Sequence, residues 1–265
     1  MAKISPVIPF PKSFGNISVY KMYGVEKLVA REKHGPTKEQ IETLPCYAKL
    51  RLCQQEFAGC GKGASLLSLA TFAVKPLSDP SYIGKLVKIC KIIQGQDTVN
   101  PLGKRSIIFS DSGSIFDGFN INSLIPFENV IQLPITYNLV RNSAQATIIL
   151  PKLHPEINMS NPGEYPLFRF IICLGIVQDL TYDGKAYAPV NPSMEQNAIQ
   201  EQTDWFSTRV IFQGLKKDIA LRNTVALDSN SNMVLSLGIQ FGRPVSNSVV
   251  EPVKRAGSGK ILAIG

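Results

Sequence analysis

The sequence predicts an α+β protein in which a β-hairpin and amphipathic helices come first and short antiparallel strands follow. Two observations predict this order. Apolar residues recur at helical spacing up to about residue 95, whereas beyond residue 105 they alternate in short runs that end at turn residues. The 18 prolines and 20 glycines are typical of a structure with many turns. A chain of 265 residues, 44% of them hydrophobic, is long enough to bury a substantial core.

Residues 15–33 have the pattern of a β-hairpin. The segments "NISVYKM" and "KLVAREK" alternate apolar with polar residues, and Gly24 between them supplies a turn. A two-stranded ribbon cannot bury an apolar face alone, so we expect it to pack on other elements or on another subunit. Its outer edges are expected to be free for strand pairing. The candidate assembly residues are Ile17, Val19, Tyr20, Leu28 and Ala30.

Helices are predicted between residues 37 and 95. Thr37 and Gln40 have the T-x-x-Q spacing of a capping box, and Pro45 ends this first helix after about two turns. Two longer apolar stripes follow at helical spacing, and we expect both to face the core. The first is Tyr47, Leu50, Cys53, Phe57 and Cys60, and the second is Ile83, Leu86, Val87, Cys90 and Ile93.

Short β-type runs separated by turn residues occupy the rest of the chain. Roughly seven strands at this spacing predict an antiparallel, immunoglobulin-like β-sandwich. In the segment "MVLSLGIQF", alternation predicts one buried face made of Met233, Leu235, Leu237, Ile239 and Phe241. The turn composition of "NPLGKR" predicts a linker near residues 100–104. The expected domains are therefore a hairpin-plus-helices module over 1–104 and a β-sandwich over 105–265.

The positive charge is concentrated in the first part of the chain. Of 28 Lys and Arg, 16 precede residue 106, together with 7 of the 20 Asp and Glu. The remaining 12 basic and 13 acidic residues nearly cancel, so the net charge of +8 belongs to the first part. Such asymmetry indicates either a polyanion partner or a basic face that meets an acidic face of another subunit. The candidate polyanion contacts are Arg31, Lys33, Lys38, Lys49, Arg51 and Lys62.

No pattern of catalytic or cofactor-binding residues is found. His34 and His154 have no acidic or cysteine cluster nearby, and "AGCGKGAS" has Gly63 where a phosphate-binding loop needs Ser or Thr. We therefore expect no enzymatic activity, no cofactor and no metal. The five cysteines, spaced unlike metal ligands, are expected to be reduced: Cys46, Cys53, Cys60, Cys90 and Cys173. The longest apolar run, "FIICLGIV", is shorter than the roughly 20 residues of a membrane helix, and no signal peptide is found, so we expect a cytoplasmic protein.

Residues 14 to about 70 resemble the start of a Bacteroidota protein family of unknown function, whose members carry G-x-I-G-x-x-S-F-Y-K followed by A-R-E-K-G-G, and the similarity to longer members extends over nearly the whole chain. The helix "CYAKLRLCQQEF" departs from the family's "AFxRTRENxxEF" by losing basic and polar positions. The resemblance implies a hairpin-plus-helix module followed by a β domain, and no activity. The matching residues are Gly15, Asn16, Ile17, Val19, Tyr20, Lys21, Ala30, Arg31, Glu32, Lys33, Gly35, Pro45, Glu56 and Phe57.

Two functions are compatible with these observations. The first is a non-enzymatic structural protein that self-associates, through the hairpin, into a homo-oligomer or filament. The second is a nucleic-acid-binding protein without sequence specificity, which uses the basic N-terminal module. Glu26 and Glu32 are interleaved with the hairpin's basic residues. Because each acid repels a phosphate backbone, the sequence favours self-association over nucleic-acid binding.

Overall fold

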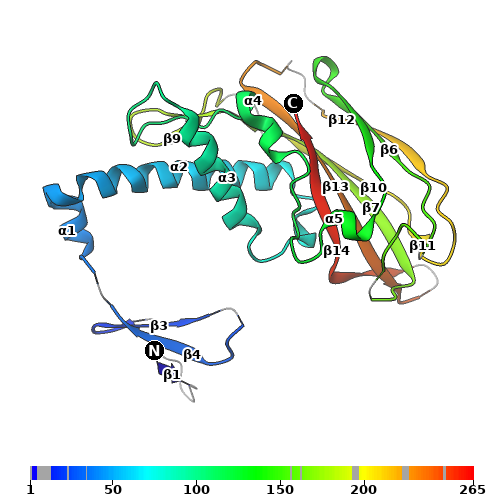
Figure 1. Ribbon diagram of the computed structural model, residues 1–265, viewed down its shortest axis with the longest axis horizontal. Helices are drawn as coiled ribbons and strands as arrows, with labels where there is room; N and C mark the ends of the chain where they lie inside the picture. The colour runs from blue at the N-terminus through cyan, green and yellow to red at the C-terminus, as the bar shows by residue number, and fades with distance from the viewer. Residues whose placement is uncertain are drawn as a thin grey trace. The chain divides into compact units, whose positions relative to one another are not determined.

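The computed structural model has an α+β fold, and the chain divides into two compact units (Figure 1). The first unit is Met1–Arg51 and the second unit is Leu52–Gly265. The described residues are 2–4, 13–22, 24–33, 35–155, 157–161, 163–192, 197–222, 227–246 and 249–265.

The described residues form helices, short 3-10 helices (η) and strands. The helices are α1 (Lys38–Thr43), α2 (Ala48–Ala70), α3 (Tyr82–Gln96), α4 (Phe109–Ser112), α5 (Phe127–Val130), η1 (Pro45–Tyr47), η2 (Lys75–Leu77), η3 (Gly113–Phe116) and η4 (Arg141–Ser143). The strands are β1 (Ala2–Ile4), β2 (Ser13–Phe14), β3 (Ile17–Lys21), β4 (Leu28–Glu32), β5 (Thr136–Val140), β6 (Gln145–Leu150), β7 (Leu167–Gln178), β8 (Leu180–Tyr182), β9 (Tyr187–Pro189), β10 (Ala198–Gln202), β11 (Phe206–Ser207), β12 (Leu215–Ala220), β13 (Ser231–Pro244) and β14 (Val250–Ile264). In this part of the chain, no helix has the length and apolar content needed to span a membrane.

The first unit begins with a four-stranded antiparallel sheet, here called the N-terminal sheet, with the order β1-β4-β3-β2. The strands β3 and β4 pair along their whole length, while β1 pairs with residues 28–30 of β4 and β2 with residues 17–18 of β3. The predicted capping box then opens α1 and is confirmed. Thr37 Oγ1 accepts a hydrogen bond from Gln40 N at 3.2 Å, and Gln40 Oε1 accepts one from Thr37 N at 2.9 Å.

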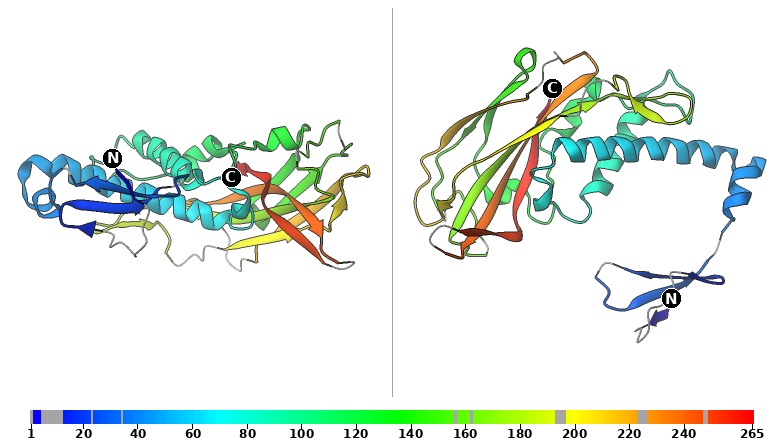
Figure 2. Two further views of the ribbon diagram at one scale, coloured as in Figure 1. Left: turned by 90° about the horizontal axis from the view of Figure 1, so that it is seen from below. Right: turned by 180° about the vertical axis from the view of Figure 1, so that it is seen from behind.

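In the second unit, two antiparallel sheets pack face to face. The larger, five-stranded sheet has the order β10-β7-β13-β14, with β11 also paired to β7, and the smaller, three-stranded sheet has the order β12-β6-β5. Figures 1 and 2 show the smaller sheet lying on one side of the larger one. The buried side chains between them include Ala146, Ile148, Leu150, Phe168, Phe170, Ile172, Leu174, Ile219, Leu235, Leu237 and Ile239.

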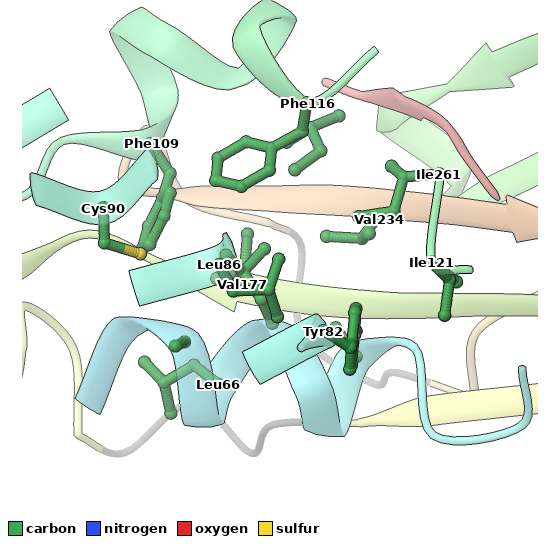
Figure 3. Close-up of a cluster of buried hydrophobic side chains, with 14 of the residues drawn as sticks. Leu66, Tyr82, Leu86, Cys90, Phe109, Phe116, Ile121, Val177, Val234 and Ile261 are labelled. Carbon is green, nitrogen blue, oxygen red and sulfur yellow. The ribbon is translucent and has the colours of Figure 1, made fainter. Parts of the chain in front are cut away.

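Helices α2 and α3 bury the opposite face of the larger sheet (Figures 1 and 2). The side chains that meet there include Leu66, Leu86, Cys90, Phe109, Phe116, Val177, Val234 and Ile261, all labelled in Figure 3. Gly175 of β7 lets the end of α2 lie close against the sheet. A Cβ atom at this position would lie 2.4 Å from the carbonyl oxygen of Ala70, the last residue of α2. The central strands β7 and β13 are therefore covered on both faces.

This arrangement differs from the expected organisation in two respects. The two packed sheets over 105–265 account for only one buried face of the larger sheet, because helices from residues 52–96 cover the other. The boundary expected near residues 100–104 is replaced by a division between Arg51 and Leu52. The physical reason is that the helices and strands of the second unit share one core, so no unit ends before the strands begin.

Helix α2 buries a different face from the predicted one. Of the expected stripe only Cys60 is fully buried, whereas Phe57 is 62% exposed. The buried face is made largely of small residues, among them Gly59, Gly63 and Ala64. In α3, the expected Leu86, Cys90 and Ile93 are buried, but Ile83 is exposed. The prediction for α2 was wrong because it assigned the large apolar residues to the buried face. The helix packs so closely on its neighbours that this face holds small residues instead.

Candidate functional site

The predicted assembly residues lie on the two central strands of the N-terminal sheet. The register pairs Val19 with Ala30, so Ile17, Val19, Leu28 and Ala30 share one face of the sheet. Tyr20 lies on the other face, opposite Val29. The side chains of Val19 and Val29 are buried, those of Leu28 and Ala30 are half-buried, and those of Ile17 and Tyr20 are exposed. Val29 was absent from the predicted set. Because it lies between Leu28 and Ala30 in the strand, its side chain is on the same face as that of Tyr20.

The edges of the predicted hairpin are less open than expected, since β1 and β2 each pair with part of it. Lys33 N donates to Asn16 O, which identifies residues 16 and 33 as a hydrogen-bonded pair. By alternation, the backbone groups of Ser18 and Tyr20 point toward β4, and those of Val19 and Lys21 point away from it. No described strand pairs with Val19 or Lys21 on that side. This stretch is the candidate pairing edge.

The six predicted polyanion contacts do not form one cluster of free cations. Arg51 donates to the carbonyl oxygens of Ile41 and Leu44 at 2.6 and 3.0 Å, at the end of α1. Lys38 forms an ion pair with Glu42 at 3.7 Å, and Lys33 donates to Ser13 Oγ and to Gly15 O. The side chains of Arg31, Lys49 and Lys62 are exposed. Half of the set therefore stabilises its own unit.

The second unit contains a buried polar cluster that the sequence analysis did not predict. The carboxylate of Glu56, on α2, is fully buried. Arg105 Nε and Nη2 donate to its two oxygens, both at 2.6 Å, and Lys91 Nζ of α3 donates at 2.5 Å. Gly103 N adds a fourth hydrogen bond at 2.9 Å. The carboxylate therefore ties α2 and α3 to the segment that was expected to be a linker.

Hydrogen bonds and packing extend this Glu56 cluster to Gln94 and Tyr187. Gln94 Nε2 donates to Arg105 O at 3.1 Å, and the hydroxyl of Tyr187 donates to the same oxygen at 2.9 Å. The ring of Tyr187 packs on Gly59, where a Cβ atom would lie 2.7 Å from the ring. The only earlier indication of the cluster was Glu56 itself, as a residue of the motif in "QQEF".

Burial and hydrogen bonding shift the pKa values of three groups in the Glu56 cluster. Burial raises the pKa of the Cys60 thiol to about 11 and that of the Tyr187 hydroxyl to about 12. Both groups are therefore neutral near pH 7, and neither supplies a nucleophile or a base. Burial also acts to raise the pKa of Glu56. The hydrogen bonds from Arg105, Lys91 and Gly103 outweigh burial, so that the pKa is lowered from 4.5 to about 2.

The lowered pKa of Glu56 predicts acid sensitivity. A carboxyl group whose pKa is lower in the folded protein stabilises it above the unfolded pKa of 4.5, and this contribution is lost as the pH falls through about 2. The loss is on the order of 3 kcal/mol. We expect urea titrations to show the free energy of unfolding falling between about pH 5 and pH 2.5, with a smaller fall in the Glu56→Gln variant. An equal fall in both proteins would show that other groups carry the acid sensitivity.

An open cleft of about 540 Å³ lies elsewhere in the second unit. Its described lining includes Glu164 and Arg209 as charged residues, and Thr208, whose hydroxyl donates to the carbonyl oxygen of Tyr165 at 2.7 Å. The described lining contains no cysteine or histidine. Among the residues that the structure describes, no group of three or more His, Cys, Asp or Glu could hold a metal ion.

Comparison of the chain with protein-family models, curated proteins and solved structures finds no match. The resemblance to a Bacteroidota family therefore stays a prediction.

Proposed function

We propose that this chain is a non-enzymatic structural protein that self-associates into a homo-oligomer or filament through its N-terminal sheet. One observation carries the proposal. Among the described side chains of the first unit, only Val19 and Val29 are buried, at 5% and 1% exposure. A unit of this size with so small a core is marginally stable by itself. Ile17, Tyr20 and Met22 remain exposed and provide apolar surface for another copy to cover.

The second unit suits the role of a rigid scaffold. Its two packed sheets resemble the sandwiches of adhesive modules, and extending this comparison to an immunoglobulin-like module is part of the proposal. The charge asymmetry supports a head-to-tail contact in which the basic first unit meets the strands after residue 105 of another copy, because these strands, unlike the α2–α3 region of the same unit, carry a slight excess of acidic residues. Such a contact brings opposite charges together without requiring a second protein.

The proposal predicts that Lys21→Pro weakens self-association. The N–H of Lys21 points away from β4, so proline removes a donor from the candidate pairing edge without breaking the β3–β4 ladder. Lys21→Ala is the matched control, because it removes the charge and keeps the donor. In size-exclusion chromatography with light scattering, we expect the proline variant to shift toward the monomer and the alanine variant to keep the wild-type mass. Equal masses for all three proteins would count against this edge.

Nucleic-acid binding is the second candidate function. The observation that favours it is that the acids of the α2–α3 region, Glu56 and Asp79, are buried and paired with Lys91, Arg105 and Lys85. The exposed charges that α2 and α3 carry are accordingly basic. This candidate predicts binding to duplex DNA with a steep salt dependence, whatever the base sequence.

A further inference from the structure

Strand β5 is an edge strand without the features that protect the other edge strands of similar or greater length in the second unit. In the order β12-β6-β5, one side of β5 faces no partner strand among the described residues. Its sequence, TYNLV, has no charge and no proline, and four of its five side chains are exposed. Charged residues and prolines are the usual protection of strand edges. The other edge strands of at least five residues have them: Glu201 in β10, Lys216, Lys217 and Asp218 in β12, and Pro252 and Lys254 in β14.

The hydrogen-bond register of β6 determines which of its residues face β5. Leu221 N donates to Ala144 O, and this pair continues the register of β12 and β6. By alternation, residues 146, 148 and 150 of β6 direct their backbone groups toward β12. Residues 145, 147 and 149 therefore direct theirs toward β5.

The same alternation places the free backbone groups of β5. Val140, Asn138 and Thr136 lie opposite residues 145, 147 and 149, so their N–H and C=O groups bond to β6. The groups of Tyr137 and Leu139 point outward, one residue on either side of Asn138. No described backbone group outside the β5–β6 ladder bonds to them. The outward donors and acceptors are thus symmetric about Asn138.

We propose that β5 pairs antiparallel with β5 of a second copy of this chain, about a two-fold axis through Asn138. Tyr137 of each copy exchanges hydrogen bonds with Leu139 of the other, which makes two closely spaced pairs on either side of the axis. The pairing joins two three-stranded sheets into one continuous sheet. This inference rests on the proposed self-association and adds a second contact to it.

A second copy is the occupant that the chemistry of β5 fits. Because the strand is uncharged, two copies meet without facing like charges. Tyr137 lies opposite Leu139 of the second copy on the core-facing side, and Thr136 lies opposite Val140 of the second copy on the outer side. The first pair places an aromatic ring against an apolar side chain, and the second joins two β-branched residues, which suit the surface of a sheet. The dyad arrangement of the outward groups meets the requirement of an isologous contact, in which the same surface serves both partners.

Charge substitutions at Asn138 test the proposal, because this exposed side chain faces itself across the axis. Asn138→Lys and Asn138→Asp each place like charges directly opposite one another. We expect either variant alone to self-associate about tenfold more weakly than the wild type in sedimentation velocity, and an equimolar mixture to recover the association. Gln145→Lys, at an exposed position of β6 on the same face, is the control and is expected to keep the wild-type association. Unchanged association of both Asn138 variants would overturn the proposal.

A cross-link supplies an independent measurement. Residues facing each other in a non-hydrogen-bonded pair have Cα atoms about 4.5 Å apart, which lies within the range of a disulfide. In a background with the exposed Cys46 and Cys53 replaced by serine, Asn138→Cys is expected to form a covalent dimer with oxidised glutathione, and Gln145→Cys is not. Absence of the Asn138 cross-link would contradict the proposed axis.

The outcomes separate this inference from the proposed function. If Lys21→Pro weakens association while the Asn138 variants do not, the result supports self-association through the N-terminal sheet and contradicts the β5 pairing. If the Asn138 variants weaken association while Lys21→Pro does not, the result supports the β5 pairing and contradicts self-association through the N-terminal sheet.

Discussion

Replacing Glu56 with alanine is expected to lower the free energy of unfolding by about 3–5 kcal/mol. The substitution removes the carboxylate that accepts hydrogen bonds from Lys91, Gly103 and Arg105, and it leaves Arg105 near α2 without its ion-pair partner. Removing one member of a buried ion pair is costly because the remaining charge keeps its desolvation penalty. Urea denaturation followed by circular dichroism measures the effect.

The control for this prediction is Glu42→Ala. Glu42 pairs with Lys38 at 3.7 Å on the exposed surface of α1, and both side chains are more than half exposed. Such pairs contribute about 0.5 kcal/mol or less. A loss below about 1 kcal/mol for Glu56→Ala would show that the cluster is not a main support of the α2–α3 packing.

Gly175→Ala is expected to destabilise the second unit by about 3 kcal/mol. An added Cβ atom would lie 2.4 Å from the oxygen and 2.6 Å from the Cα of Ala70, and backbone atoms cannot move aside as the end of a side chain can. The last turn of α2 would have to shift away from β7. Thermal unfolding compares this variant with Gly84→Ala, whose added Cβ has no neighbour within 4 Å.

The glycine at position 84 lies in the first turn of α3, where alanine is the better helix former. Gly84→Ala is therefore expected to stabilise the protein by about 0.5–1 kcal/mol. If both variants had the same melting temperature, the close contact between α2 and β7 would be contradicted.

The local elements of the fold were predictable from short-range chemistry. The capping box at Thr37 and Gln40 depends on residues three positions apart, so it was predicted and is confirmed. The overall α+β composition followed from periodicity. The buried face of α2 was not predictable in this way, because its closest contacts use Gly59 and Gly63 instead of large apolar residues.

Long-range polar contacts explain why the domain organisation differs from the expected one. The segment around Gly103 has the composition of a linker, yet it is held to α2 by a carboxylate 47 residues earlier in the chain. No spacing rule connects Glu56 with Arg105, which lies 49 residues later. Only the packing of α2, α3 and the 97–106 segment brings these charges together.

The candidate site was predictable in part. The alternation in residues 15–33 identified the two central strands of the N-terminal sheet, but the short β1 and β2 gave no periodic signal. The direction of the Lys21 and Tyr137 backbone groups depends on strand register, which alternation within a single strand does not determine. Both proposed pairing edges therefore required the structure.

Sedimentation velocity of the wild-type protein across a dilution series measures whether the chain self-associates. We expect masses above 29.1 kDa that fall toward the monomer on dilution, and no binding of a duplex DNA added at moderate salt. A protein that stays monomeric at high micromolar concentration, and binds duplex DNA with an affinity that drops steeply with salt, would contradict the proposed self-association.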